Sequence, residues 1–455
     1  MADHYADLIW GDDSESQVFA EARADNLSVT FKFLLDGRVP QSRPSRIVAC
    51  FHGLPAKAAN ETFPSRRLMR EAIDVLIRGV WIQCTGHPSI AAPDVLVQIF
   101  ENTEGHVQWR ACRESSYTQF AESLLPVGSL SDEEELKSRT DYSSLIQLRQ
   151  LGGRGNATAV RRSSSSEGLF VFKGVDFKTF LEAPADFRHR KEMCYHEIRT
   201  IASLPRHPNI VPPPEAFVTV RRVDDDQGEE FLCGMLVPLL GDGTLDDEIN
   251  KSNAAGARLE LKEKAAWSFQ MACAVAHTHL VAHTFHMDIK PSNFVVDTNR
   301  ALILVDWEQS GAALYTLAPE ADGTWDVVEE GAPSIDQPPV YKKYGGPPRE
   351  NLSWGRPKWN VFPIWRNVSP RALEAAEVFS LGRTMWMMLQ QVSQSEVEDV
   401  EEVVTCWNES SGDIPETWKA VVNRCVHPDP NRRIRLWDLV TFWDMEQRST
   451  VHGSA

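Results

Sequence analysis

The residues best suited to chemistry lie in one stretch of this chain. The run His-Met-Asp-Ile-Lys-Pro-Ser-Asn occupies positions 286–293, and Leu-Val-Asp follows at 304–306. Phosphoryl transfer from a nucleotide requires a carboxylate that orients the attacking hydroxyl, a cation near the migrating phosphate, and oxygen ligands for magnesium. The residues of these types are Asp288, Lys290, Asn293 and Asp306. Their order and spacing predict a phosphoryl-transfer loop.

Two short apolar runs would position these residues. Phe-Val-Val at 294–296 and Ala-Leu-Ile-Leu-Val at 301–305 are typical of strands, and the polar segment 297–300 suits a tight turn. A hairpin would bring Asn293 close to Asp306, where both could bind magnesium, an ion that takes only a few protein ligands. The alternative is a solvated loop before an ordinary hairpin. The ordered set of His, Asp, Lys, Asn and Asp favours the site.

The same stretch resembles the catalytic and metal-binding loops of eukaryotic protein kinases, whose pattern is H-R-D-L-K-x-x-N followed by D-F-G. The resemblance covers residues 145–447, and the layout is similar to that of the kinase-like proteins of filamentous fungi. It implies an α+β, two-lobed protein-kinase-like fold. A small β-rich lobe would span 145–240, and a larger helical lobe would span 241–447 with an insert at 321–365. Residues 1–135 would form an N-terminal α/β extension.

The resemblance also implies ligands and roles. ATP and Mg2+ would be the cofactors, and the partner would be a protein substrate with a Ser/Thr hydroxyl, because Lys290 resembles the Ser/Thr-type pattern. Asp288 would act as the catalytic base, and Lys290 would stabilise charge on the transferred phosphoryl group. Asn293 and Asp306 would hold magnesium.

A kinase also needs a strand lysine for the phosphates and a helix glutamate that holds this lysine. By resemblance, these are Lys173 in the strand-like run 169–175 and Glu197 in the helical run 195–201, with Glu192 as the alternative glutamate.

The adenine and phosphate sites follow from the same resemblance. A strand predicted at 232–239 leads to a hinge whose backbone groups would bind adenine, at Pro238, Leu239 and Leu240. Backbone amides must approach the phosphates closely, so glycines are expected above them. The run at 151–160 matches that pattern only loosely, through Gly152, Gly153 and Gly155.

Motifs of the larger lobe resemble structural elements of the family. A helix predicted at 265–280 leads to the catalytic loop. Glu377 stands where the family has Asp in D-V-W-S-L-G, and its carboxylate would secure the catalytic-loop backbone. Arg433 ends a run similar to D-P-x-x-R, and its expected partner is a glutamate after the activation segment. Glu320 and Glu374 both fit, and the choice stays open.

Two departures from the family pattern carry predictions. Met287 replaces the Arg that reads an activation-loop phosphate, so we expect activity that does not depend on phosphorylation of that loop. Trp307 and Glu308 replace Phe and Gly after the metal-binding Asp. Glycine permits positive φ and large loop movements. We therefore expect a fixed loop, with Asp306 facing the metal.

Two other functions stay open. A small-molecule phosphotransferase of the choline or aminoglycoside kinase type shares H-x-D-x-x-x-x-N, and Val-Asp-Trp-Glu at 305–308 resembles its metal segment. Lys290, Glu377 and Arg433 resemble protein kinases instead. A pseudokinase scaffold is the non-enzymatic alternative, which the irregular glycine run favours.

Residues 1–135 contain no chemical motif. Strands are predicted at 27–35 and 47–51, a helix at 66–77, a hairpin from 95–100 and 107–109, and a linker or helix start at 131–135.

Composition and net charge limit the class of protein and its binding partners. The chain has 455 residues, 42% hydrophobic and 24% charged, as in ordinary globular proteins. The net charge of −17 argues against nucleic acid and anionic membranes as partners.

No apolar run approaches the roughly 18 residues of a membrane span. Eight cysteines without a C-x-x-C pair predict neither a zinc site nor a disulfide framework. Without a secretory signal, an intracellular protein is expected, cytoplasmic or nuclear. The oligomeric state is not predicted.

Overall fold

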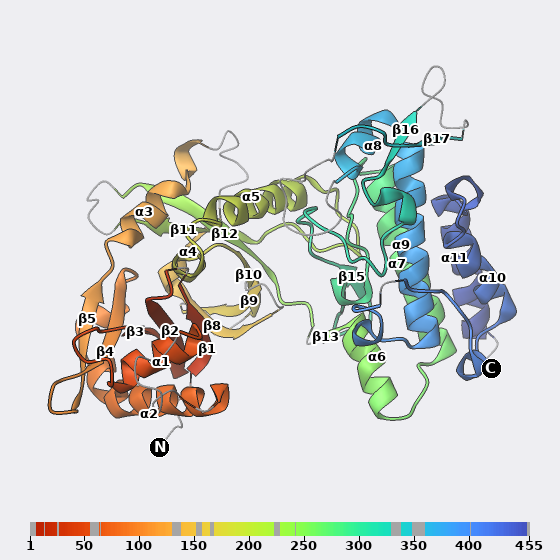
Figure 1. Cartoon of the computed structure of the whole chain (residues 1–455). Helices are drawn as coiled ribbons and strands as arrows, with labels where there is room; N and C mark the ends of the chain where they lie inside the picture. The colour runs from red at the N-terminus through yellow and green to blue at the C-terminus, as the bar shows by residue number, and fades with distance from the viewer. Residues whose placement is uncertain are drawn as a thin grey trace. The chain divides into compact units, whose positions relative to one another are not determined.

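The computed structural model describes most of the chain (Figure 1). The described residues are 6–12, 14–24, 27–54, 63, 65–129, 138–151, 157–163, 168–222, 228–241, 243–328, 338–347, 360–400 and 402–452. Within them the fold is α+β, with eleven α-helices and four β-sheets. The chain divides into two compact units, Met1–Tyr195 with Pro214–Pro238 and His196–Pro213 with Leu239–Ala455. None of the described helices combines the length and apolar character needed to cross a bilayer.

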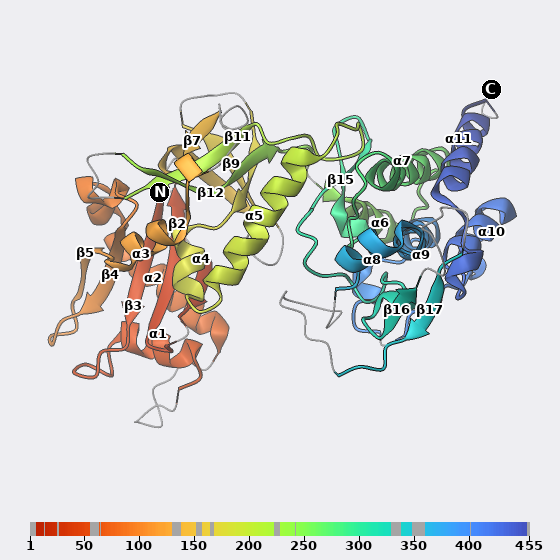
Figure 2. The ribbon, with the colours of Figure 1, turned by 90° about the horizontal axis from the view of Figure 1, so that it is seen from above.

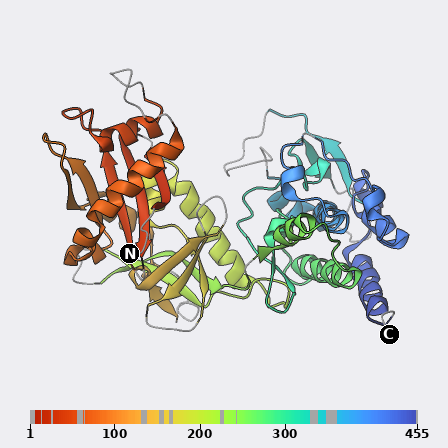
Figure 3. The same ribbon diagram turned by 90° about the horizontal axis from the view of Figure 1, so that it is seen from below.

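The first unit begins with a five-stranded sheet. Its strands run in the order β1 (Ala6–Gly11), β2 (Gln17–Ala24), β3 (Leu27–Leu34), β4 (Val95–Glu101) and β5 (Val107–Arg113). Neighbours are antiparallel except β3 and β4, which are parallel. Helices α1 (Arg43–Phe51) and α2 (Arg66–Thr85) connect those two strands and pack on the sheet (Figure 3). The predicted strand at 27–35, helix at 66–77 and hairpin at 95–109 are confirmed.

The strand predicted at 47–51 is wrong, because this segment belongs to helix α1. Ser42 caps the helix by accepting a hydrogen bond from the Ser45 backbone N–H, and Pro44 lies in the first turn. Ile47 and Val48 are buried against the sheet. A continuous apolar run of this length does not distinguish a buried strand from one buried helical face.

A seven-stranded sheet forms the rest of the first unit. Its main order is β7 (Arg139–Asp141), β11 (Ala216–Arg221), β12 (Glu230–Pro238), β10 (Phe170–Gly174), β9 (Ala157–Arg162) and β8 (Leu145–Gln150). Helices α4 (Phe177–Glu182) and α5 (Phe187–Ser203) follow β10 in the chain. The strands predicted at 169–175 and 232–239 are confirmed as β10 and β12, and the helix predicted at 195–201 lies within α5.

Residues before 135 also contribute to this second sheet. Strand β6 (Leu125–Pro126) pairs with β12, and helix α3 (Ser116–Ser123) buries Tyr117 and Phe120 in the same core as Phe172. The acidic run 131–135 lies outside the described residues.

A buried ionic network joins the two sheets. Glu21 of β2 is fully buried and pairs with Lys178 of α4 at 2.7 Å and with Arg23 at 3.0 Å. Lys178 also donates to Gln147 of β8 at 2.8 Å. The amino-terminal sheet is therefore tied to the sheet that contains Lys173.

The second unit is mainly helical (Figure 2). Its helices are α6 (Leu245–Ala254), α7 (Leu261–Leu280), α8 (Phe362–Val368), α9 (Pro370–Gln390), α10 (Glu416–Cys425) and α11 (Leu436–His452). Helix α9 is buried along almost all its length and packs against α7, α8 and α10. The helix predicted at 265–280 is confirmed as α7.

Two small sheets complete the second unit. Strands β13 (Gly243–Thr244), β14 (Phe294–Val296) and β15 (Leu302–Leu304) form an antiparallel sheet beside α6 and α7. Strands β16 (Trp325–Val328) and β17 (Val340–Lys343) form a hairpin within the predicted insert. Tyr341 of this hairpin packs edge-on against Trp365 of α8. Trp354 and Trp359 of the insert lie outside the described residues.

Candidate active site

The predicted hairpin is present and holds the ends of its two strands together. Strands β14 and β15 pair with Phe294 opposite Leu304, and the Val305 N–H donates to the Asn293 carbonyl at 2.9 Å. The turn closes through Asp297, whose carboxylate accepts from two backbone N–H groups. Val305 therefore lies beside Asn293, and Asp306 is the next residue in the chain.

Asp288, Lys290 and Asn293 form one hydrogen-bonded group. Lys290 Nζ lies 2.6 Å from Asp288 Oδ2, and Asn293 Nδ2 donates to the same oxygen at 3.1 Å and to the Asp288 carbonyl at 2.7 Å. The other oxygen, Oδ1, accepts from the backbone N–H of Ala313 at 2.8 Å. Three residues predicted from spacing are thus in direct contact.

Glu377 anchors the backbone just before Asp288. Its Oε1 accepts from the N–H groups of His286 at 2.8 Å and Met287 at 2.5 Å, and Oε2 lies 2.6 Å from His279 Nε2. Burial pushes the pKa of Glu377 upward, but His279 and the Met287 N–H outweigh it and lower the pKa. A charged Glu377 thus fixes the backbone just before Asp288, as the resemblance implied for this carboxylate.

His286 connects the two predicted loops. Its Nε2 lies 2.8 Å from the Val305 carbonyl, which can only accept, so the proton resides on Nε2. Burial lowers the pKa of His286, and the ring is therefore neutral near pH 7. The ring also packs edge-on against Trp307, with centroids 4.8 Å apart.

Asp306 lies in a cluster of carboxylates. Oxygens of Glu197, Asp306 and Glu308 lie within 4.8 Å of one another. Carboxylate oxygens are the ligands that Mg2+ prefers, so this donor set suits the predicted ion. Glu308 was not predicted as a ligand, because the pattern places a glycine there. The available signal was an acidic residue two positions after Asp306, the predicted metal ligand.

The segment after Asp306 is held firmly. Trp307 is fully buried, and its N–H donates to Glu197 at 3.1 Å. Gln309 Oε1 accepts from His196 Nε2 at 2.9 Å, and Gln309 Nε2 donates to the Phe285 carbonyl. This geometry supports the expected fixed loop.

Two residues of the site adopt the left-handed backbone region that disfavours side chains. Met287 has φ 77° and Asp306 has φ 72°. Such conformations cost about 1–3 kcal/mol and persist only where the surroundings hold them. Buried Met287 and the contacts of Trp307 provide that support.

The two residues predicted to act at the phosphates lie on the elements expected for them. Lys173 lies on β10, on the opposite face from the buried Phe172, as strand alternation requires. Glu197 is buried on α5, whereas the alternative Glu192 is exposed and pairs with Arg188 on the same helix. Lys173 and Glu197 belong to different units, and their pairing stays a prediction.

The hinge residues follow β12. Pro238 ends that strand, and Leu239 and Leu240 continue without regular structure, all three half-buried. Adenine binding there stays a prediction. Gly152, Gly153 and Gly155 lie between β8 and β9, outside the residues that the structure describes.

The partner of Arg433 is Glu320. The two side chains form a bidentate pair, Nη1 to Oε1 at 2.5 Å and Nη2 to Oε2 at 2.9 Å, and both are buried. Glu374 pairs instead with Arg435, through two bonds of 3.0 Å. The choice that the sequence left open is thus decided.

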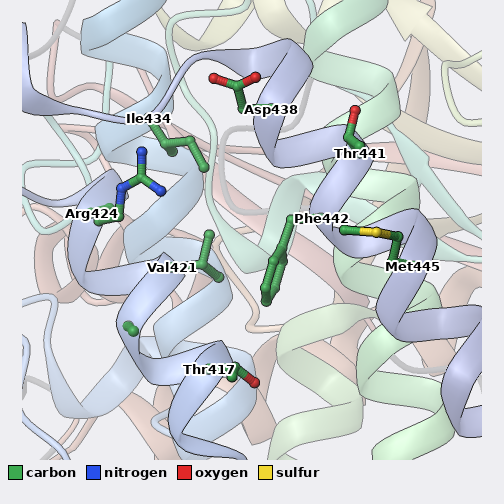
Figure 4. A pocket seen from close by; sticks show the side chains of 9 residues that line it. Thr417, Val421, Arg424, Ile434, Asp438, Thr441, Phe442 and Met445 are labelled. Carbon is green, nitrogen blue, oxygen red and sulfur yellow. The ribbon is translucent and has the colours of Figure 1, made fainter.

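A groove between α10 and α11 is separate from these residues (Figure 4). Its volume is about 400 Å³, and Phe442 stands between Val421 and Met445. Arg424 and Asp438 lie toward one end. The groove shares no residue with the candidate site.

Comparison with models of known protein families finds no match for this chain, and comparison with curated protein sequences finds none either.

Proposed function

We propose that this chain is an ATP-dependent protein kinase that transfers a phosphoryl group to Ser/Thr hydroxyls. The observation that carries the proposal is the contact of Asp288 with Lys290 and Asn293. The hairpin that follows bonds the backbone of Val305, the residue before Asp306, to that of Asn293. Phosphoryl transfer depends mainly on positioning and on stabilisation of charge. A pre-organised carboxylate, cation and amide provide the groups for both.

In this proposal Asp288 orients the acceptor hydroxyl and takes its proton. Lys290 would leave Asp288 to stabilise charge on the transferred group. Asn293 and Asp306 would hold magnesium, which neutralises phosphate charge when bound. Lys173 would contact the non-transferred phosphates with Glu197 as its support, and the backbone of Pro238, Leu239 and Leu240 would bind adenine. The glycines of 152–155 would cover the phosphates.

The order of elements supports this assignment. A strand with Lys173, a helix with Glu197 and a strand that ends at Pro238 follow one another in a mostly antiparallel sheet. In the other unit, Glu377 fixes the backbone before Asp288, and Glu320 pairs with a buried arginine. These are the supports that a two-lobed protein kinase would need.

One observation favours a second candidate, a small-molecule phosphotransferase of the choline or aminoglycoside kinase type. Glu308 lies with Asp306 in the carboxylate cluster. The D-W-E sequence resembles the metal segment of that group more than it resembles D-F-G.

The cysteines support the proposed compartment, and the net charge supports a class of substrate. None of the eight cysteines, all of which lie within the described residues, forms a disulfide bond, which suits the reducing environment of the proposed cytoplasmic or nuclear location. The net charge of −17 would favour basic peptide substrates over acidic ones.

The test uses the full chain with radiolabelled ATP and magnesium. Basic and acidic proteins and a panel of amino alcohols are offered as acceptors, with Asp288→Asn as the matched, nearly isosteric control. Label on protein that the variant loses supports the protein kinase. Label on an amino alcohol alone supports the second candidate. ATP binding without any transfer would overturn both and leave a pseudokinase.

A further inference from the structure

We propose that the backbone N–H of Ala313 positions Asp288 for catalysis, an inference that rests on the proposed phosphoryl transfer. The N–H donates to Asp288 Oδ1 at 2.8 Å, from the segment that follows the metal-binding Asp306. Ala313 itself contributes no side-chain donor. The group that acts is part of the main chain.

The hydrogen bonds to Asp288 leave little freedom in its carboxylate. Each carboxylate oxygen accepts about two hydrogen bonds. Oδ2 receives Lys290 and Asn293, and Oδ1 receives Ala313. The remaining acceptor position is on Oδ1, where a substrate hydroxyl would bind. The Ala313 N–H therefore fixes the rotation of the carboxylate and directs its free lone pair.

The donor is rigidly held. The Ala313 carbonyl accepts from the N–H groups of Thr316 and Leu317, at 3.1 and 2.9 Å. Tyr315 and Thr316 are buried, and Arg383 reaches the Tyr315 carbonyl at 3.5 Å. A turn that is anchored on both sides of its tip can hold one N–H in place, as pre-organised catalysis requires.

A blocking role makes the opposite prediction. If the N–H stood where the substrate hydroxyl must bind, its removal would open Asp288 and raise turnover. A positioning role predicts that removal lowers turnover.

The test removes this N–H in two ways. Ala313→Pro removes it with a ring, and replacement of Ala313 by lactic acid removes it as a backbone ester without a ring. Leu314→Pro is the matched control, because the exposed Leu314 makes no backbone N–H bond within the described residues and proline suits the second position of a turn. Thermal unfolding checks that each variant folds.

We expect kcat to fall roughly 10- to 100-fold in both Ala313 variants, with KM for ATP and peptide within about twofold. Leu314→Pro should keep wild-type values. Unchanged or increased kcat in the ester variant would overturn the positioning role.

A second measurement separates this inference from the proposed function. Amide hydrogen exchange of the Ala313 N–H is measured by NMR in wild type, in Asp288→Ala and in Asp288→Asn, which keeps a side-chain oxygen as acceptor. Protection that Asp288→Ala loses and Asp288→Asn partly keeps supports the Ala313 contact even if no phosphoryl transfer is found. Equal protection in wild type and Asp288→Ala refutes the contact even in an active enzyme.

Discussion

Glu320 and Arg433 form a bidentate ion pair inside the second unit, 113 positions apart in the chain. Arg433 also donates to the carbonyls of His427 and Ala375, so all three nitrogens of its guanidinium make hydrogen bonds. Glu320 follows Asp306 by only a short segment. The pair therefore fixes the far end of the segment that begins at Asp306.

Removal of either partner of this pair should be strongly destabilising. Glu320→Gln or Arg433→Met leaves a buried charge without its partner, which costs about 3–5 kcal/mol. Arg435→Met, on the half-exposed neighbouring pair with Glu374, should cost clearly less. Urea unfolding of the three variants measures the difference. Equal losses would contradict the buried character of the first pair.

Loss of the Glu377 carboxylate should release the loop that contains Asp288. Glu377→Ala leaves the buried N–H groups of His286 and Met287 without an acceptor, at about 1–3 kcal/mol each. Amide hydrogen exchange should lose protection at these two positions, while Glu377→Asp retains part of it. Retained protection in the alanine variant would show that another group holds the loop.

Metal affinity should depend on both Asp306 and Glu308. Each change to the amide, Asp306→Asn or Glu308→Gln, removes one anionic ligand, and we expect Mn2+ affinity to fall about tenfold or more. Electron paramagnetic resonance of Mn2+, with and without ATP, gives the dissociation constant of the metal for each variant. Glu192→Gln, an exposed carboxylate on the same helix as Glu197, is the control and should change nothing. A tenfold loss of Mn2+ affinity in Glu192→Gln would show that general surface charge, and not ligation by Asp306 and Glu308, sets the affinity.

Acid should remove the stability that Glu21 contributes. Burial raises its pKa, but Lys178 and Arg23 outweigh burial and lower the pKa to about 2. A depressed folded-state pKa gives stability that is present above the unfolded-state value and is lost as pH falls toward about 2. At pH 7, Glu21→Gln should cost about 3 kcal/mol. That difference should shrink between pH 4.5 and about 2 in thermal unfolding. The control Glu104→Gln, at an exposed side chain, should follow wild type.

Activity should survive phosphatase treatment. The hydroxyl residues between Asp306 and Glu320 are Ser310, Tyr315 and Thr316, with exposures of 7%, 8% and 1%. Buried hydroxyls are poor acceptors for another kinase, and Met287 offers no cation for a phosphate. Phosphatase-treated protein, checked by mass spectrometry, should retain turnover within about twofold. A large loss restored by incubation with ATP would contradict this.

Local patterns in the sequence predicted much of the site. The hairpin after Asn293 was visible because its strands are apolar and its turn is polar. Strand β10 with Lys173 and helix α5 with Glu197 follow from periodicity in the same way. The spacing placed Asp288 and Lys290 in one loop, but the ion pair between them was not predicted.

Contacts between distant segments were not predictable in this way. The bond from Ala313 to Asp288 uses a backbone N–H, which carries no residue signal. Glu320 and Glu374 have the same side chain, and only the fold selects which one meets Arg433. The segment 47–51 was misread because tertiary burial, not strand pairing, accounts for its apolar residues.

The pairing of β6 with β12 bears on how this protein should be shortened for study. A fragment that starts at residue 145 would expose the backbone of Phe231 and Leu232 and remove Tyr117 and Phe120 from their core. Such a fragment would have an unpaired sheet edge and an exposed apolar surface, and both features promote aggregation. Expression trials should keep everything from Ser115 onward, and preferably the whole amino-terminal sheet.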